Sequence, residues 1–406
     1  MIGESTTEAW DDRTFEVSRF HTRGRMHTDG AGARIVDQIY VERIRPTARE
    51  PLPRIVCVHG TDQTGLCFLR TADGRPGWAY DFAQLGWEVY VVDQVARGRS
   101  VYDPAVHGPL TRLPLGEVEA LFTGAAAHHR FPRAGSHARW PGGPGVSGNP
   151  AFDAFATSQV ASLADVALAE ELNTRALTEL FDSIGGAVLL THSQASVFGF
   201  QLCDHEPDLV HKHITIEPNG PPFHDIEPIP SARVDDAGDR AAPPGRPWGI
   251  TRLPLTYEPA TRSPDELRST RLPGGAGLRN GGWLQQEPAR TLPRLARTPQ
   301  VVVSADASFR SDIDGWTHRF LVQAGVPAVH LRLSDHGFSG NGHMMMQEEN
   351  SVAIARLLSE WARRDAPSSI LDSTAPGNPG TVEGWGPTAP PRARASAADR
   401  STAGQL

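Results

Sequence analysis

One serine lies where a short apolar run gives way to a helical pattern, in the segment Thr191-His192-Ser193-Gln194-Ala195. A serine hydroxyl can act as a nucleophile when a sharp strand-to-helix turn lifts it above the sheet edge, because the following helix N-terminus favours negative charge. The usual pattern for such an elbow has glycines where this sequence has Thr191 and Ala195. The same serine could also be an ordinary helix N-cap. Ser193 is therefore a candidate nucleophile that needs support from other segments.

A second segment supplies candidate hydrogen-bond donors for the negatively charged oxygen of a reaction intermediate. The apolar residues 55–58 run directly into His59-Gly60-Thr61. In serine hydrolases the amide just after such a strand, together with the amide that follows the nucleophile, donates to the oxyanion. We therefore predict that the backbone amides of Thr61 and Gln194 form an oxyanion hole. Gly60 also suits a tight turn that requires a positive φ, which is compatible with this role.

Two acids and two histidines follow the serine in an order that suits a catalytic triad. Glu217 and Asp306 each come directly after a predicted strand. His343 lies in a glycine-rich loop before the last predicted helix, and His336 lies closer to the end of the last strand. The order serine, acid, histidine holds for every combination of these residues. From the residues alone, both the acid and the base stay open.

The elements that would position these residues alternate between apolar runs and helical patterns. This alternation predicts an α/β fold, with a mostly parallel sheet of about eight strands flanked by helices. The first two strands would form a leading antiparallel pair joined at residues 30–32. The predicted strands cover residues 15–20, 35–44, 54–58, 88–92, 187–190, 214–216, 301–303 and 329–333, and the clearest helices cover residues 78–85, 194–203 and 352–363.

Domain boundaries follow from composition. We predict one globular domain over residues 1–364, interrupted by insertions at about 102–173 and 221–297. Long interruptions inside a compact domain are usually lids or binding elements. Residues 365–406 are rich in Pro, Gly, Ser and Thr and hold few large aliphatic residues, so we expect a disordered tail. The insertions carry aromatic residues that could line a pocket or form small cores: Phe122, Phe131, Trp140, Phe152, Phe155, Trp248, Tyr257 and Trp283.

Charge and composition exclude several classes of partner. The 406-residue chain has a net charge of −8, which disfavours nucleic acid as a ligand. Its 3 cysteines and its histidine pairs lack the spacing of a disulfide framework or a metal site, so we expect neither a metal nor another cofactor. The glycine motif at residues 143–148 follows no strand, which argues against nucleotide binding. No membrane span or secretory signal is visible, which predicts a cytoplasmic protein.

Several blocks of sequence resemble a known family, the α/β-hydrolase superfamily, and within it the subgroup of a bacterial esterase called seven-thirteen. The resemblance covers residues 54–363. It rests on His59-Gly60 with Gln63-Thr64-Gly65, Asp73-Gly74-Arg75-Pro76-Gly77-Trp78, Val92-Asp93-Gln94 with Arg97-Gly98-Arg99-Ser100, Thr191-His192-Ser193-Gln194, Glu217-Pro218, and Gly340-Asn341-Gly342-His343-Met344-Met345-Met346-Gln347.

The resemblance implies a role for each candidate residue. It implies Ser193 as nucleophile, Glu217 as acid and His343 as base of a serine hydrolase that cleaves carboxylic esters or lactones through an acyl-enzyme. That esterase has two adjacent cysteines where this chain has Thr61 and Asp62, so a vicinal disulfide is absent here. A carboxylate beside a developing oxyanion is unfavourable unless it points away.

Two other functions remain open from the sequence. An acyltransferase would use the same acyl-enzyme with an alcohol or amine acceptor, and a catalytically silent relative would be a binding module. A small-molecule substrate and a homodimer complete the expectations about partners. Arg97 and Arg99 are expected to form structural ion pairs.

Overall fold

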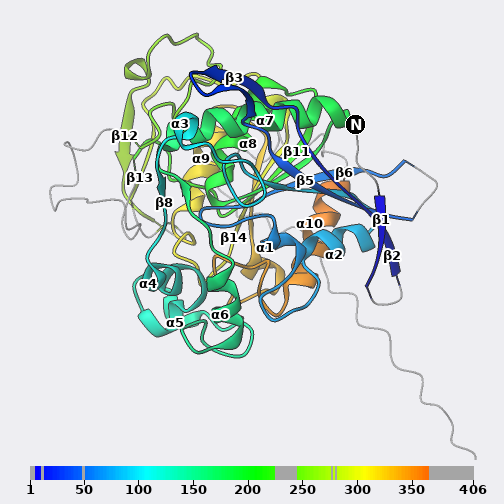
Figure 1. The fold of residues 1–406 in the computed structure, drawn as a ribbon. Coiled ribbons are helices and arrows are strands. Elements are labelled where there is room, and N and C mark those ends of the chain that lie inside the picture. The colour runs from blue at the N-terminus through cyan, green and yellow to red at the C-terminus, as the bar shows by residue number, and fades with distance from the viewer. Residues whose placement is uncertain are drawn as a thin grey trace, which may run out of the picture. The chain divides into compact units, whose positions relative to one another are not determined.

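A computed structural model describes residues 5–10, 13–47, 51–224, 245–275, 278 and 281–364 of the chain (Figure 1). Residues 365–406, for which we expected a disordered tail, lie outside the described residues. The described part up to residue 364 falls within one compact unit. No helix in these ranges has the length and apolar character needed to cross a bilayer.

A central sheet of nine strands organises the molecule, in the order β1-β2-β5-β7-β6-β10-β11-β14-β15. The neighbours from β7 to β15 are all parallel, and β1, β2 and β5 extend the sheet in antiparallel pairs. The predicted mostly parallel α/β sheet is confirmed, with nine strands where about eight were expected. The strands are β1 (Ser5–Trp10), β2 (Arg13–His21), β5 (Tyr40–Pro46), β6 (Arg54–Val58), β7 (Glu88–Asp93), β10 (Ala187–His192), β11 (Val210–Ile216), β14 (Gln300–Ser304) and β15 (Ala328–Arg332).

The leading antiparallel pair is more elaborate than predicted. Residues 35–44 were expected to form one strand joined to residues 15–20 by a turn at 30–32. Instead, β3 (Arg25–Asp29) and β4 (Gly32–Val36) form a separate hairpin, and β2 pairs with β5. A break at Asp37, which has a φ of 66°, separates β4 from β5. The turn at residues 30–32 therefore closes the small hairpin and not the edge of the main sheet.

Helices cover both faces of the sheet. Alternate side chains of a strand pack against the helices on one face or the other. In β6, Ile55 and Cys57 join a core cluster with α2 (Trp78–Gln84) and α10 (Ser351–Arg363). Val56 and Val58 join a second cluster with α7 (Val166–Ile184), α8 (Ser196–His205) and α9 (Asp314–Gln323). Because successive side chains of a strand point to opposite faces, a fully apolar strand is buried on both sides. This explains the continuous apolar runs at residues 55–58 of β6 and 187–190 of β10.

The first insertion is shorter than predicted. Helix α7 begins at Val166, where the side chain of Asp165 accepts hydrogen bonds from the amides of Ala167 and Leu168, and the helix packs in the main core. Residues 166–173, which the prediction included in the insertion, thus belong to a helix of the sheet layer. The insertion proper holds α3 (Pro104–His107), β8 (Leu110–Thr111), α4 (Leu115–Val118), η1 (Glu119–Thr123), α5 (Ala125–His128), η2 (Ala134–Ser136), α6 (Pro150–Thr157) and β9 (Ser162–Leu163).

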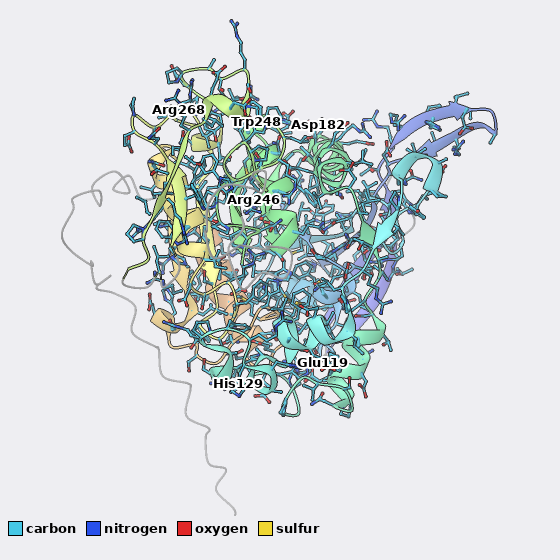
Figure 2. All side chains as sticks on the ribbon, turned by 90° about the vertical axis from the view of Figure 1, so that its left-hand side faces the viewer. Glu119, His129, Asp182, Arg246, Trp248 and Arg268 are labelled. Atoms are coloured by element: carbon cyan, nitrogen blue, oxygen red, sulfur yellow. The ribbon has the colours of Figure 1, made fainter. Side chains whose placement is uncertain are left out.

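The second insertion lies in a different part of the unit. Its described part contains the pair β12 (Ser269–Leu272) and β13 (Gly282–Gln285), with the short turns η4 (Pro264–Glu266) and η5 (Leu295–Arg297). Figure 2 shows Glu119 and His129 of the first insertion at the opposite end from Trp248 and Arg268 of the second. The remaining short elements are α1 (Leu66–Leu69), η3 (Ser193–Ala195) and η6 (Leu333–His336).

Candidate active site

Ser193 sits on the sharp turn between β10 and α8. Its φ of 52° lies in the left-handed region, which is strained for a residue other than glycine. A Cβ atom placed on Gly60 would lie 3.0 Å from the Cβ of Ser193 and 2.9 Å from Nδ1 of His192. Only glycine therefore allows the loop after β6 to approach the serine this closely. A sharp turn of this kind is what a nucleophile elbow needs, although Thr191 and Ala195 occupy the positions where that motif has glycines.

Glu217 follows β11 and contacts His343. The Nδ1 atom of His343 lies 2.7 Å from Oε2 of Glu217, and both side chains are buried. The amide of Ala305 donates to Oε1 of Glu217 at 2.8 Å, and the hydroxyl of Ser308 donates to Oε2. Three donors thus fix the orientation of the carboxyl group, which in turn fixes the orientation of the imidazole.

His343 is enclosed by aromatic rings. Phe122 of η1 and Phe309 place their ring centroids 5.0 Å and 4.8 Å from that of the imidazole. The ring of His192 is 4.6 Å away, and its Nε2 lies 3.0 Å from the carbonyl oxygen of His343. His343 is thereby held against the residue that precedes Ser193.

The other ring nitrogen of His343 is not occupied. Within the described part of the chain, Nε2 of His343 is buried and has no hydrogen-bond partner, Ser193 included. Ser193 itself is only 7% exposed. In the absence of substrate, the hydrogen bond between nucleophile and base is often long or unformed. The nitrogen that would receive a proton is therefore free of competing donors.

Burial shapes the proton affinities of both groups. Burial raises the pKa of Glu217 above its usual range, whereas the Ser308 hydroxyl, the Ala305 amide and the Arg310 guanidinium favour the ionised form. The pKa of His343 falls well below its usual range, because burial and the nearby Arg310 cation disfavour a second positive charge. The resting imidazole is consequently neutral at neutral pH and can accept a proton.

The rival acid and the rival base lie apart from this contact. Oδ1 of Asp306 accepts a hydrogen bond from the amide of Gly340 at 2.9 Å and is not bonded to His343. His336 is half-buried at the end of η6. Of the alternatives that the sequence left open, the structure brings together Glu217 and His343.

The candidate oxyanion donors stand on either side of the elbow. Thr61 follows Gly60, and Gln194 is the residue after Ser193. Within the described residues, neither backbone amide donates a hydrogen bond to another group. Two free amides next to a serine hydroxyl form a suitable site for a developing negative charge.

Asp62 points away from this site. The hydroxyl of Ser162 and the amide of Leu113 each donate to its carboxylate at 2.6 Å, and its own carbonyl accepts from Val160 at 2.8 Å. These partners belong to the first insertion, so the carboxylate anchors the insertion and does not face the oxyanion. This geometry removes the conflict that its position next to Thr61 suggested.

This anchor leads to a prediction about stability. Asp62→Ala should lower the free energy of unfolding by about 1–3 kcal/mol, because it leaves buried donors of Ser162 and Leu113 without an acceptor. Urea denaturation followed by circular dichroism measures the change. In the control Asp73→Ala, the lost ion pair with Arg75 is partly exposed, and the loss should stay below about 1 kcal/mol. Equal losses in the two variants would contradict the proposed anchoring role.

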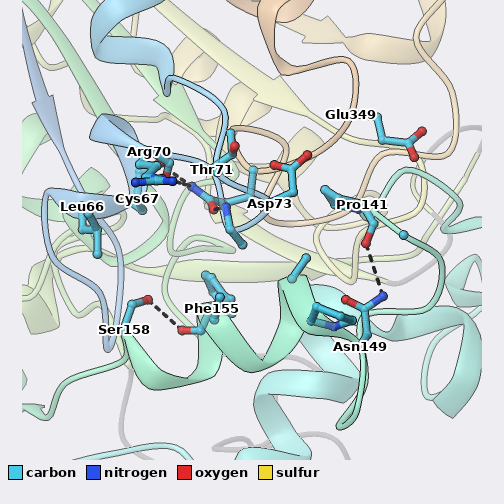
Figure 3. A pocket seen from close by; sticks show the side chains of 17 residues that line it. Leu66, Cys67, Arg70, Thr71, Asp73, Pro141, Asn149, Phe155, Ser158 and Glu349 are labelled. Carbon is cyan, nitrogen blue, oxygen red and sulfur yellow. Dashed lines mark hydrogen bonds between the residues drawn. The ribbon is translucent and has the colours of Figure 1, made fainter.

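The aromatic residues of the insertions divide between the two roles considered for them. Phe122 contacts the imidazole, and Phe131 packs edge-on against Phe309 at 6.3 Å. Trp140 and Phe155 instead pack on each other at 5.5 Å inside the insertion. Near them lies a cavity of about 690 Å³ between α1, α6 and the loop that follows His343 (Figure 3). Its lining includes none of Ser193, Glu217 and His343.

Two arginines near the site were considered from the sequence, and one serine was not. Arg99 forms the expected ion pairs, at 2.8 Å to Asp93 and 2.7 Å to Glu42. Arg97 was expected to do the same, but it forms no ion pair within the described residues. Ser308 was not considered, since it belongs to no motif and becomes relevant only through its contact with Glu217. The position of Ser308 shortly after a strand end was the only available signal.

Comparisons with known proteins agree with the fold. No family model matches the chain. It is 39% identical over 328 residues to the probable secreted lipase phiG of Fungal sp. (strain ATCC 74256), which covers 80% of this chain and 86% of that protein. Among solved structures, a bacterial esterase determined at atomic resolution matches with a TM-score of 0.58 and 21% identity, over 88% of this chain and 96% of that chain.

The fungal relative corrects the predicted cellular location and establishes the family to which the chain belongs. The cytoplasmic location predicted from the sequence is wrong, because the fungal relative is described as secreted, which points to a location outside the cell. The extent and identity of the match exceed what a shared fold alone requires, and the fold agrees with that of the bacterial esterase. The chain therefore belongs to the α/β-hydrolase family of carboxylic ester hydrolases.

Proposed function

We propose that the protein hydrolyses carboxylic esters or lactones with Ser193 as nucleophile, His343 as general base and Glu217 as the acid that orients it. The observation that carries this proposal is the 2.7 Å contact between Nδ1 of His343 and Oε2 of Glu217. This contact uses Nδ1 of His343 and leaves the unpartnered Nε2 available to accept the proton of Ser193. No metal or organic cofactor takes part in this chemistry.

The proposed reaction has two half-reactions. His343 Nε2 takes the proton of the Ser193 hydroxyl while Oγ bonds to the carbonyl carbon, and the carbonyl oxygen becomes an oxyanion held by the amides of Thr61 and Gln194. The imidazolium then protonates the alcohol oxygen as its bond to carbon breaks, which leaves an acyl-enzyme. Water, deprotonated by His343, attacks the acyl carbon, and Ser193 leaves with the proton.

The walls of the site favour apolar groups, and the first insertion covers it. Phe122 and Phe309 flank the imidazole and contact each other. An aliphatic or aromatic part of the substrate could take the place of the contact between the two rings with little loss of binding free energy. Ser193 is nearly closed to solvent, and Phe122 belongs to the insertion. We infer that residues 102–165 act as a lid that moves to admit substrate.

Turnover of nitrophenyl esters with increasing acyl length tests this function. We expect release of nitrophenol and free acid in water, and added alcohol should divert only a minor part of the acyl group. An acyltransferase would transfer most of the acyl group to the alcohol instead. Complete inactivity towards all esters would favour a silent binding module. The expected homodimer stays a prediction, which light scattering of the purified protein tests.

The choice of acid leads to a prediction. Glu217→Gln should lower kcat by about 10²- to 10⁴-fold, because an amide in place of the carboxylate no longer stabilises the imidazolium or holds the required tautomer. Asp306→Asn is the matched control: Asp306 contacts Gly340 and not His343, so kcat should change less than about threefold. Steady-state kinetics on one nitrophenyl ester measure both. The reverse order of effects would overturn the assignment of the acid.

A further inference from the structure

Arg97 is a buried cation that lies beside both candidate oxyanion donors. It is 3% exposed, and it lies in the loop that follows β7. Buried arginines are normally paired with a carboxylate, because an uncompensated charge is costly in the protein interior. Within the described residues Arg97 has no such partner. Its guanidinium instead bonds only to oxygen atoms of neutral groups.

The first pair of contacts reaches the loop after β6. Nη1 of Arg97 donates to the carbonyl oxygens of Gly60 and Gln63, at 3.2 Å in each case. The Gly60 carbonyl and the Thr61 amide belong to the same trans peptide group, in which the oxygen and the hydrogen point in opposite directions. A charged donor on the oxygen polarises the peptide and strengthens the hydrogen bond that its N–H can donate. Arg97 therefore acts on the far side of the peptide whose N–H is to hold the oxyanion.

His59 adds a second donor to the same carbonyl. The amide of Gln94 donates to Nε2 of His59 at 3.1 Å, so the proton of the neutral ring lies on Nδ1. Nδ1 then donates to the Gly60 oxygen at 3.0 Å. Burial, together with the nearby Arg97 cation, lowers the pKa of His59 to about 3, which keeps this ring neutral. Two donors on one carbonyl fix the peptide plane as well as its polarity.

The second pair of contacts reaches the side chains of Gln94 and Gln194. Nη2 of Arg97 lies 3.3 Å from Oε1 of Gln194 and 3.3 Å from Oε1 of Gln94. The backbone amide of Gln194 is the second candidate oxyanion donor. One guanidinium thus connects the two segments of chain that must meet around the same oxygen atom. Although burial lowers the pKa of Arg97 to about 10, the side chain remains a cation at neutral pH.

We propose that Arg97 is a positioning residue that prepares the oxyanion hole, by polarising the Gly60–Thr61 peptide and by fixing Gln194 against it. This inference rests on the proposed function. In the transition state, the developing negative charge lies in line with the N–H of Thr61 and the guanidinium behind it. The favourable interaction between the Arg97 cation and the oxyanion is thus strongest in the transition state. An interaction of this kind affects kcat and not substrate binding.

Kinetics of Arg97→Gln and Arg97→Lys test the inference. Removing one oxyanion donor outright costs about 10²- to 10³-fold, so Arg97→Gln should lower kcat by about 10- to 100-fold and change KM less than about threefold. Arg97→Lys keeps the charge but not the fork of donors, and it should recover part of the loss. If Arg97→Gln does not fold, Arg97→Lys carries the test with an expected loss of about 3- to 10-fold.

A pair of inhibitors separates positioning from a merely structural effect. A trifluoromethyl ketone, which adds to the serine and forms an oxyanion, should bind the Arg97 variants more weakly by the same factor as kcat falls. The corresponding methylene isostere forms no oxyanion, and its affinity should be unchanged. Arg99→Gln is the matched control, because Arg99 lies on the same loop and pairs with Asp93 and Glu42. It should lower thermal stability and leave the ratio of the two inhibitor affinities unchanged.

The outcomes distinguish this inference from the proposed function. Arg97 variants that retain the wild-type affinity for the ketone would overturn the role of Arg97, even if kcat falls. An equal change of the inhibitor ratio in the Arg99 variant would overturn it as well. A wild-type protein that neither cleaves esters nor binds the ketone would refute the proposed function itself.

Discussion

Ser193→Ala should lower kcat for ester hydrolysis by about 10⁵- to 10⁶-fold, the loss typical of removing the nucleophile from a serine hydrolase. The nearest neighbours of a Cβ placed on Gly60 belong to His192 and Ser193, and of these two residues only Ser193 carries a hydroxyl. Hydrolysis of a nitrophenyl ester by the purified variant measures the loss. The residual rate would come from the oxyanion donors and from substrate binding.

Ser196→Ala is the matched control for this variant. Ser196 lies one helical turn further along, is fully buried, and accepts a hydrogen bond from the amide of Asn219 at 2.8 Å. Its loss should cost less than about tenfold in kcat, since Asn219 also donates to the Ser193 carbonyl at 3.1 Å. A Ser193→Ala protein that folds and keeps more than about one per cent of wild-type kcat would rule out Ser193 as the nucleophile.

His343→Ala should have a similar effect, with a fall in kcat of about 10⁴- to 10⁶-fold, because it removes the imidazole that Glu217 contacts and that is proposed to accept the serine proton. His336→Ala should leave kcat within about threefold of wild type, since the imidazole that Glu217 contacts is that of His343. Stopped-flow measurement of the nitrophenol burst shows whether acylation itself has failed.

The structure also introduces a rival base that the sequence did not suggest. The Nδ1 atom of His192 is buried without a hydrogen-bond partner in the described part of the chain. However, Nε2 of His192 bonds to the carbonyl of His343, and no carboxylate contacts the ring to stabilise a positive charge. We expect His192→Gln to lower kcat by less than about 10²-fold. A larger loss in His192→Gln than in His343→Ala would contradict the assignment of the base.

The main strands were predictable because they are apolar on both faces. Residues 54–58, 187–190 and 301–303 all lie within strands of the central sheet. Burial between two helical layers requires such continuous apolar runs, so composition alone reveals them. The two ends of the sheet were harder to predict. The hairpin of β3 and β4 is partly exposed, and its sequence does not show where it separates from β5.

Two helices that cover the sheet were also hard to predict. The start of α7 depends on Asp165 as a cap and on packing against α8, which a local pattern does not reveal. Helix α9, which begins with Asp314 and Gly315, mixes charged and apolar residues and was not predicted. Its burial arises from contacts with β13, β14 and β15, which are far apart in the sequence.

The candidate site divides in the same way. Ser193, Glu217 and His343 were recognisable because each belongs to a motif at a strand end or in the final loop. The partners that orient them were not recognisable, because Ser308, Arg97 and Phe122 act through contacts across the fold. The direction of Asp62 was equally hidden, since its partners Ser162 and Leu113 lie in the insertion. Sequence motifs thus identify the candidate reacting groups, and the tertiary structure shows the contacts that surround them.

The most direct test of the central claim is to locate the adduct of a fluorophosphonate probe. The probe forms a bond between its phosphorus and an activated serine oxygen, and fluoride leaves. Peptide mass spectrometry should find the adduct on Ser193, with no labelling of Ser193→Ala and much slower labelling of His343→Ala and Glu217→Gln. An adduct on another serine, or undiminished labelling of the Ser193→Ala protein, would contradict the proposed triad.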